Sequence, residues 1–178
     1  MKVFMFVIIL NVLVITKTMS VVRYYSDPHF HHRNMAIKRG FKDEDEMNEH
    51  VIQEWNKVVS KKDVTYILGD ITMEKNNYEI LNRLNGIKKV ILGNHDEPQH
   101  VPYLLKYVNN VSALKYLKHK EFGNIILSHA PIHPQELEYR FNINIHGHVH
   151  TNSLPDKRYI NVSAEVIDYK PKLLSELL

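Results

Sequence analysis

Carboxylate, amide and imidazole side chains recur at five places in the sequence, and each place directly follows an apolar run. The five stretches are YYSDPHF, YILGD, VILGNHDE, IILSHA and INIHGHVH. In open α/β sheets, ligands bind beyond the carboxyl ends of the strands, on loops carried by a rigid scaffold. We therefore expect one shared site to contain Asp27, His29, Asp70, Asn94, His95, His129, His148 and His150.

These side chains are suited to holding divalent metal ions. The sequence contains 12 histidines and no cysteine, which excludes thiolate ligands and disulfide bonds. Mixed nitrogen and oxygen ligands suit Mn²⁺, Fe, Zn²⁺, Co²⁺ or Ni²⁺ better than Ca²⁺. Where two ions lie close together, a carboxylate can contact both through its two oxygens, whereas an imidazole usually cannot.

Each motif alone also has an ordinary interpretation. Asp, Asn and Gly favour turns after strands, and the stretch HGHVH could be a surface cluster of histidines. Five such motifs in succession, each after an apolar run, favour a common site instead. We expect Gly69, Gly93 and Gly147 to permit tight backbone turns beside the polar residues.

The last motif holds three histidines at alternating positions. On an extended segment, residues two apart face the same way, so His148 and His150 can point at the same place. His146 shares this spacing but has no ligand role. We expect it to support the neighbouring ligands or the fold.

The scaffold that positions these residues is predicted to be a mixed α/β domain. Residues 43–60 have the pattern of an amphipathic helix, with acidic residues at the N-terminal end and an apolar stripe that places Trp55 in the core. Shorter helices are predicted at residues 78–85 and 101–108. Strands are predicted at residues 21–25, 64–68, 89–92, 113–116, 124–127, 143–145 and 159–162.

The composition is that of a globular protein with one core. The 178 residues are 44% hydrophobic and 24% charged, which is ordinary for such a domain. The net charge of +3, without a long run of Lys or Arg, favours an anionic substrate only weakly and does not establish nucleic-acid binding.

Residues 1–18 stand apart from the domain, which we place at residues 19–178. The apolar run at residues 3–15 is too short for a bilayer core of about 30 Å, at about 1.5 Å per helical residue. It suits a signal-peptide core, but no small-residue cleavage site follows. Three interpretations stay open: a leader or non-native extension outside the fold with Met19 as the start, a targeting or anchoring segment, or an integral strand or helix. We favour a cytoplasmic protein without a stable membrane span, or a secreted or membrane-associated one if the segment is a targeting signal.

The motif series D-x-H, G-D, G-N-H-D, S-H and G-H-x-H resembles that of the calcineurin-like metallophosphoesterase superfamily. The resemblance covers residues 24–165, and the stretches SDPHFHHRN and EMNEHVIQEWNKVV are similar to small bacterial and phage members without large inserted domains. Residues 71–74 depart from the many members that carry an extra polar residue there. The resemblance implies a single-domain, four-layer αββα sandwich, in which helices flank two mixed β-sheets.

The resemblance also implies two divalent metal ions, with Mn²⁺ favoured. Asp70 is the implied bridge between the ions. The other ligands divide into one set of Asp27, His29 and His150 and a second set of Asn94, His129 and His148. Two such ions would activate a bridging hydroxide, which attacks phosphorus in line with the leaving group.

Four further residues are candidates for roles around the ions. His95 stands beside Asn94 without a ligand role and is the expected acid that protonates the leaving group. Asp96 is a catalytic candidate that would orient His95, or else a turn residue that bonds local amides. His32 and His133 are substrate-binding candidates, and for His32 the alternative is an exposed loop position.

Three hypotheses for function remain. The leading one is hydrolysis of phosphodiester or phosphomonoester bonds in small or nucleotide-like molecules, with diesters favoured because members without a cap have an open site. The second is a nuclease for single-stranded DNA or RNA, against which stands the lack of a dense basic stripe. The third is a non-catalytic scaffold of the same fold, which would typically lose ligands, whereas this chain has every expected ligand and His95.

Overall fold

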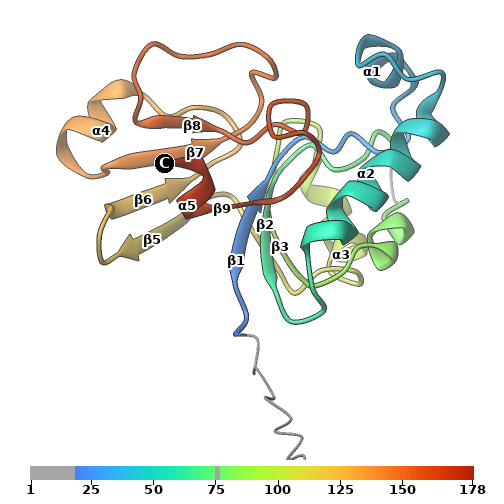
Figure 1. Cartoon of the computed structure of the whole chain (residues 1–178), viewed down its shortest axis with the longest axis horizontal. Coiled ribbons are helices and arrows are strands. Elements are labelled where there is room, and N and C mark those ends of the chain that lie inside the picture. Colours follow the sequence, from blue (N-terminus) through green and yellow to red (C-terminus); the bar gives the residue numbers. More distant parts are fainter. Residues whose placement is uncertain (1–18, 75–76) are drawn as a thin grey trace, which may run out of the picture.

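The first of two β-sheets contains the early strands of the chain, in the order β4-β3-β2-β1-β9 (Figure 1). The computed structural model describes residues 19–74 and 77–178, so the predictions for residues 1–18 lie outside the described residues. The strands of this sheet are β1 (Val22–Tyr25), β2 (Val64–Leu68), β3 (Ile87–Ile91), β4 (Asn110–Ser112) and β9 (Lys172–Leu173). The first four run parallel and β9 is antiparallel to β1, so the loops after β1, β2 and β3 leave the same edge.

The second sheet contains the later strands, in the order β5-β6-β7-β8. They are β5 (Lys115–His119), β6 (Gly123–Leu127), β7 (Ile143–His146) and β8 (Tyr159–Asn161). Strand β5 is antiparallel to β6, and β6, β7 and β8 run parallel. The backbone of Gly147 donates to the carbonyl of His129 at 2.9 Å, which ties together the loops after β7 and β6.

Helices complete a mixed α/β domain of two mixed sheets, which confirms the predicted fold class at this level. Within the described ranges, the α-helices are α1 (Arg33–Lys38), α2 (Glu44–Val58), α3 (Val101–Leu104), α4 (Pro134–Tyr139) and α5 (Leu174–Leu177). Figure 1 shows α2 on one side of the first sheet and the second sheet on the other. None of the helices in the described part of the chain has the length and apolarity needed to span a membrane.

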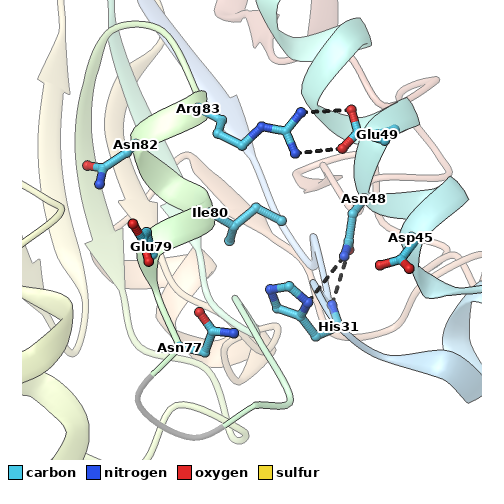
Figure 2. A pocket seen from close by; sticks show the side chains of 9 residues that line it. All are labelled: His31, Asp45, Asn48, Glu49, Asn77, Glu79, Ile80, Asn82 and Arg83. Atoms are coloured by element: carbon cyan, nitrogen blue, oxygen red, sulfur yellow. Dashed lines mark hydrogen bonds and ion pairs between the residues drawn. The ribbon is translucent and has the colours of Figure 1, made fainter.

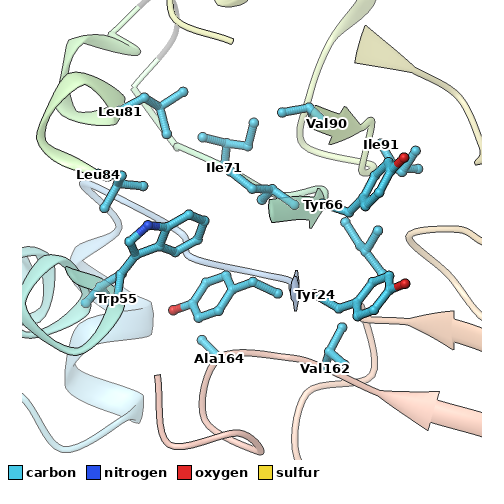
Figure 3. Packing of buried hydrophobic residues seen from close by; sticks show 14 of the residues in the cluster. Tyr24, Trp55, Tyr66, Ile71, Leu81, Leu84, Val90, Ile91, Val162 and Ala164 are labelled. Atoms are coloured by element: carbon cyan, nitrogen blue, oxygen red, sulfur yellow. The ribbon is translucent and has the colours of Figure 1, made fainter. Parts of the chain in front are cut away.

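Helix α2 packs its apolar stripe into the core, as predicted. Asp43 caps its start by accepting a hydrogen bond from the Glu46 amide at 2.9 Å. Trp55 is 1% exposed, packs edge-on against Tyr25 at 5.3 Å between ring centroids, and donates its indole N–H to the carbonyl of Asn85. Figure 3 shows Trp55 among the buried side chains of the first sheet.

Several predicted elements differ from the structure in type or length. Residues 78–85 form a 3₁₀ helix, η1 (Glu79–Arg83), because the chain makes a tight turn into β3 rather than a regular helix. The helix predicted at 101–108 ends after Leu104, following a second 3₁₀ turn, η2 (Pro98–His100). The strand predicted at 113–116 is shifted to β5, because the turn at 120–122 sets its pairing with β6. The short elements α1, α4, α5, β4 and β9 carry no strong periodicity and were not predicted.

Candidate metal centre

The predicted polar residues converge where the carboxyl ends of strands from the two sheets meet. Asp27, Asp70 and Asn94 follow β1, β2 and β3 of the first sheet, and His129, His148 and His150 follow β6 and β7 of the second. Two clusters result. We call Asp27, His29 and His150 the Asp27 group, and Asp70, His129 and His148 the Asp70 group; in each, one potential ligand atom per residue lies within 4.8 Å of the others.

Two members of the Asp27 group are fully buried, and the group contains polar atoms without partners. Asp27 is 0% exposed and His29 is 1% exposed. Among the described residues, Asp27 Oδ1 and His29 Nε2 have no hydrogen-bond partner, although they lie 3.7 Å apart. Burial lowers the pKa of His29 to about 3 despite the attraction of Asp70, so its imidazole is neutral at physiological pH. Buried polar atoms are rarely left unsatisfied, and a bound cation would satisfy both of these.

The Asp70 group is more open, and its donors lie close together. His129 Nε2 lies 2.8 Å from Asn94 Oδ1, and His148 Nδ1 lies 2.9 Å from the same oxygen. The two imidazole nitrogens are 3.2 Å apart. Asn94 thus joins the Asp70 group, as predicted. His129 is buried, whereas His148 is exposed to solvent.

Asp70 lies between the two clusters. Its Oδ2 is 3.7 Å from His29 Nε2 and 3.3 Å from His129 Nε2. Burial would raise the pKa of the Asp70 carboxyl, but the hydrogen bond and attraction of His129 outweigh it and lower the pKa to about 2. An ionised carboxylate therefore faces imidazole nitrogens from both clusters, which is the arrangement that a bridging ligand needs.

The spacing of the donors suits metal ions. Bonds of about 2.1 Å to nitrogen and oxygen place neighbouring ligand atoms ~3.0 Å apart at right angles and ~3.4 Å apart at the tetrahedral angle. The separations of 2.8 to 3.3 Å in the Asp70 group and 3.7 Å in the Asp27 group lie around these values. Nitrogen and oxygen donors without sulfur fit the divalent ions expected from the sequence.

Hydrogen bonds orient two of the imidazoles toward the centre. His129 Nδ1 lies 2.7 Å from the carbonyl oxygen of Leu68, and His150 Nδ1 lies 2.7 Å from Glu165 Oε1. Because these oxygens accept, the Nδ1 atoms carry protons, and Nε2 is the atom of each ring that would bind a metal ion. Metal-binding histidines in proteins are held in this way.

The backbone at the candidate ligands is strained. Asp27, His29, Asp70, His148 and His150 all have φ between +49° and +69°. Non-glycine residues rarely adopt this region, at a cost of about 1–2 kcal/mol each. Five such residues in one cluster indicate that the fold holds these side chains in place for function.

Glycines let the loops approach each other closely. Gly69 has φ +85°, which confirms its predicted turn role. Turns also begin at Gly93 and Gly147, whose carbonyls accept hydrogen bonds from the amides of Asp96 and Val149, although neither glycine has a left-handed φ. A Cβ at Gly93 would overlap Asp70 Oδ1, and a Cβ at Gly147 would overlap Ser26 Oγ and Asp27 Oδ2. These two glycines make room for the carboxylates.

Two other histidines border the clusters. His95 Nε2 lies 3.9 Å from Asp70 Oδ2, and its side chain is 42% exposed, which leaves it accessible to a bound molecule. The rings of His32 and His95 both pack edge-on against His29, at 5.5 and 5.7 Å between centroids. His32 also caps α1 by accepting from the amide of Met35. Both rings lie beside the clusters, and their roles toward a substrate stay predictions.

The predicted orienting role of Asp96 is wrong. Its Oδ2 accepts from the amides of Asp70 and Gly93, and its Oδ1 accepts from the amide of Ile71. The described residues give it no hydrogen bond to the ring of His95. The alternative interpretation holds, since the buried Asp96 carboxylate fastens the loop after β3 to the loop after β2.

The remaining two histidines lie apart from the ligand atoms. His133 is exposed and caps α4 by accepting from the amide of Gln135. No described contact joins it to either cluster, so its substrate-binding role has no support. His146 is 1% exposed, contacts the Gly147 carbonyl through Nδ1 and packs against Tyr159. This agrees with the supporting role expected for it.

His31 lies between His29 and His32 in the loop after β1. It contacts helix α2 instead of the two clusters. Asn48 of α2 accepts a hydrogen bond from its amide and contacts its Nδ1. Figure 2 shows the His31 ring beside a polar cavity of about 400 Å³ that lies between α2 and η1. Arg83 and Glu49 form a two-armed ion pair at this cavity, with distances of 2.5 and 2.7 Å.

Three residues around the Asp27 group were missed from the sequence. Glu165 contacts His150 and Arg39, and Ser163 donates its hydroxyl to Asp27 Oδ2 at 3.0 Å. Burial would raise the pKa of Glu165, but the His150 hydrogen bond and the Arg39 charge outweigh it and lower the pKa to about 2. A signal was present for two of them, because Ser163 and Glu165 follow the predicted strand at 159–162.

Comparison with known proteins gives relatives over most of the chain. No family model matches it. "Uncharacterized protein MJ1445" of Methanocaldococcus jannaschii is 37% identical over 162 residues, which cover 82% of each chain. The Gene 66 protein of Mycobacterium phage D29 is 31% identical, with 83% of this chain and 89% of that protein covered. The crystal structure of the protein of unknown function AQ665 from Aquifex aeolicus superposes with a TM-score of 0.73 at 27% identity, covering 89% of this chain and 97% of that one.

Proposed function

We propose that this chain, which belongs to the same family as the archaeal protein MJ1445 and the phage D29 Gene 66 protein, is a two-metal phosphoesterase of the calcineurin-like type. One observation carries the proposal. The ionised carboxylate of Asp70 lies between two clusters of nitrogen and oxygen donors, with Oδ2 3.7 Å from His29 Nε2 and 3.3 Å from His129 Nε2.

The proposal includes the four-layer αββα sandwich of that superfamily. Its support is that α2 and the second sheet lie on opposite sides of the first sheet (Figure 1). The strand order of each sheet brings the loops that follow β1, β2, β3, β6 and β7 to one place.

The two clusters would each hold one divalent ion, with Asp70 shared between them. When bound, two such ions supply an activated water nucleophile and neutralise charge on the phosphoryl oxygens. Mn²⁺ is the favoured ion, because carboxylate and amide oxygens supplement the imidazoles. The partnerless atoms Asp27 Oδ1 and His29 Nε2 support a cation at the Asp27 group in particular.

His95 is the proposed proton donor. It follows the ligand Asn94, and its backbone amide donates to Asp70 Oδ1 at 3.0 Å, which fixes the start of its side chain beside the shared carboxylate. Its partly exposed imidazole can reach the oxygen of a departing alcohol and transfer a proton to it. His32, on the other side of His29, is proposed to contact the substrate.

The proposed substrates are phosphodiesters of small or nucleotide-like molecules. The exposed side chains of His148 and His95 give a bound phosphate access from solvent. A phosphodiester carries two organic groups. One departs as the alcohol, and the other stays on the phosphate and extends outward, where an open rim can accommodate it.

The test is hydrolysis of bis-p-nitrophenyl phosphate by the full chain, first stripped of metal and then supplied with Mn²⁺, Ni²⁺, Co²⁺ or Zn²⁺. We expect turnover that depends on added metal. Turnover with none of the four ions, by a protein that remains folded, would contradict the diesterase. A protein that also binds none of them would match a non-catalytic scaffold.

A further inference from the structure

We infer that Glu165 and Arg39 are positioning residues for the Asp27 group, acting through His150 and through the backbone of Asp27. The inference rests on the proposed two-metal function and extends it to residues outside the five motifs. Arg39 caps the end of α1, 12 residues after Asp27, and Glu165 lies beyond β8, 15 residues after His150.

Glu165 fixes the ring of His150. Its Oε1 accepts the Nδ1 proton of His150 at 2.7 Å, which leaves Nε2 with a lone pair. The His150 ring stacks on that of His29 at 5.2 Å between centroids, so the orientation of one imidazole constrains the other. A carboxylate behind a ligating histidine fixes its tautomer and raises its basicity, and loss of such a partner typically weakens metal binding about 10–100-fold.

Arg39 connects the Glu165 carboxylate to the backbone of Asp27, on the other side of the Asp27 group. Its Nη2 donates to Glu165 Oε2 at 2.6 Å and to the carbonyl of Asp27 at 2.8 Å, and its Nη1 donates to the carbonyl of Pro28 at 3.3 Å. Asp27 has φ +56°, and these bonds hold its backbone in that unfavourable conformation. The Arg39 guanidinium therefore links the backbone of Asp27 to Glu165, the carboxylate that contacts His150.

The Arg39 guanidinium is itself held in place. Its side chain is 3% exposed, and it packs over the ring of Tyr169 with 5.8 Å between Cζ and the centroid. Nη1 also contacts the sulfur of Met47 in α2. A planar, buried guanidinium with several fixed partners holds its neighbours more rigidly than a flexible lysine could.

The same kind of ion pair elsewhere in the chain offers a control. Arg83 and Glu49 form a two-armed pair on the surface of α2 and η1, with about half of each side chain exposed. No described contact joins this pair to either cluster. Glu49→Ala removes a carboxylate from an arginine without touching the candidate metal centre.

The first measurement is the tautomer of His150 in the metal-free full chain, by long-range ¹⁵N–¹H NMR, with His150→Gln to assign the signal. We expect the Nδ1-protonated form in the unaltered chain and in Glu49→Ala. In Glu165→Ala we expect a mixture of tautomers. Glu165→Gln has one oxygen, which should face Arg39 because a guanidinium can only donate, so its NH₂ faces His150 Nδ1 and should favour the Nε2-protonated form. This change of tautomer in a side chain of the same size is the second readout if Glu165→Ala folds poorly.

The second measurement is Mn²⁺ affinity by titration calorimetry for the same four chains and for Arg39→Lys. Glu165→Ala should weaken one of the two bound ions by about 10–100-fold and leave the other nearly unchanged, since Glu165 contacts only the Asp27 group. Arg39→Lys should weaken the same ion by a smaller factor. A general structural defect would weaken both ions together.

The outcomes separate the inference from the proposed function. If the unaltered chain binds no Mn²⁺, the proposed function fails, and the tautomer measurement still tests whether Glu165 positions His150. If the unaltered chain binds two ions, and Glu165→Ala keeps both its affinities and the single His150 tautomer, the positioning role is overturned.

Discussion

The two halves of the candidate metal centre differ in how they are held. In the Asp27 group, Asp27 and His29 are buried and His150 is half-buried, and Asp27 Oδ1 and His29 Nε2 lie 3.7 Å apart without a hydrogen-bond partner among the described residues. The donors of the Asp70 group lie at 2.8 to 3.2 Å from one another around Asn94, and His148 is exposed. Arg39, Glu165 and Ser163 surround the first group, whereas the second is held by backbone groups, the Leu68 carbonyl behind His129 and the His95 amide at Asp70 Oδ1.

This difference indicates which of the two groups is already arranged to hold an ion before any ion binds. Separated donors without partners gain contacts when a cation binds and lose none. Donors that already bond to one another must first part, and an exposed side chain must also be ordered. We therefore expect the Asp27 group to bind its ion first and more tightly, and the Asp70 group to complete the centre.

Asp70→Ala removes what the two groups share and should give the largest effect. The Asp70 Oδ2 atom faces both His29 and His129, so both ions should be weakened. We expect metal-dependent hydrolysis to fall by about 10⁴-fold, equivalent to ~5.5 kcal/mol of transition-state stabilisation. The measurement is turnover together with metal content by mass spectrometry. Asp156→Ala, a change to a surface carboxylate paired with Arg158, is the control, and retention of both ions by Asp70→Ala would remove Asp70 from the bridging position.

His95→Gln should slow the reaction without affecting either group. Its side chain is near Asp70 but outside both donor sets. We expect turnover to fall by about 10²-fold, most strongly for esters with poor leaving groups, because these need the proton most. The measurement is hydrolysis of a series of aryl phosphodiesters, with His119→Gln in the exposed β5–β6 hairpin as the control. Stoichiometric loss of metal from His95→Gln would show that His95 is a ligand instead.

Alanine at two glycines should damage the two groups separately. Gly147→Ala places a Cβ against Asp27, and Gly93→Ala places one against Asp70. Each change should cost about 1–3 kcal/mol of stability through overpacking. Gly147→Ala should weaken mainly the binding of the higher-affinity ion. Calorimetry measures this affinity, and thermal unfolding measures the loss of stability. Gly40→Ala is the control, because Gly40 has φ +85° but no atom within 4 Å of the added Cβ. Equal weakening of both ions by Gly147→Ala would contradict the assignment of separate groups.

The smallest expected effect is the difference in affinity between the two bound ions in the unaltered chain. We expect two binding steps for Mn²⁺ that differ by about 10-fold or more, equivalent to about 1.4 kcal/mol. His148→Ala should remove the weaker step and leave the tighter one, because His148 is the exposed member of the Asp70 group. Loss of the tighter step instead would reverse the order proposed for the two groups.

The clustering of the candidate ligands could be predicted from the sequence because each follows an apolar run. Parallel strands deliver their following residues to one edge, so strand order and spacing are enough to predict that Asp27, Asp70 and Asn94 lie together. The division of His148 and His150 between the clusters came from the family resemblance, and the structure groups the two residues in that way.

Other features depend on contacts between loops that are far apart in the sequence, and these contacts cannot be predicted from local patterns. Asp96 bonds amides 25 and 26 residues earlier, and nothing local distinguishes that use from orientation of His95. Gly93 and Gly147 lie in turns, as predicted, but the room that they leave for carboxylates across the centre depends on contacts distant in the sequence. Arg39 and Glu165 are 126 residues apart, and their contact depends on how the two sheets pack.

The most direct measurement is a crystal structure of the full chain soaked in Mn²⁺, with anomalous scattering to locate the ions. We expect two ions that share Asp70, one also bound by Asp27, His29 and His150 and the other by Asn94, His129 and His148. At limiting Mn²⁺, the ion at the Asp27 group should appear first. Anomalous peaks at neither group, in crystals saturated with Mn²⁺, would contradict the two-metal centre.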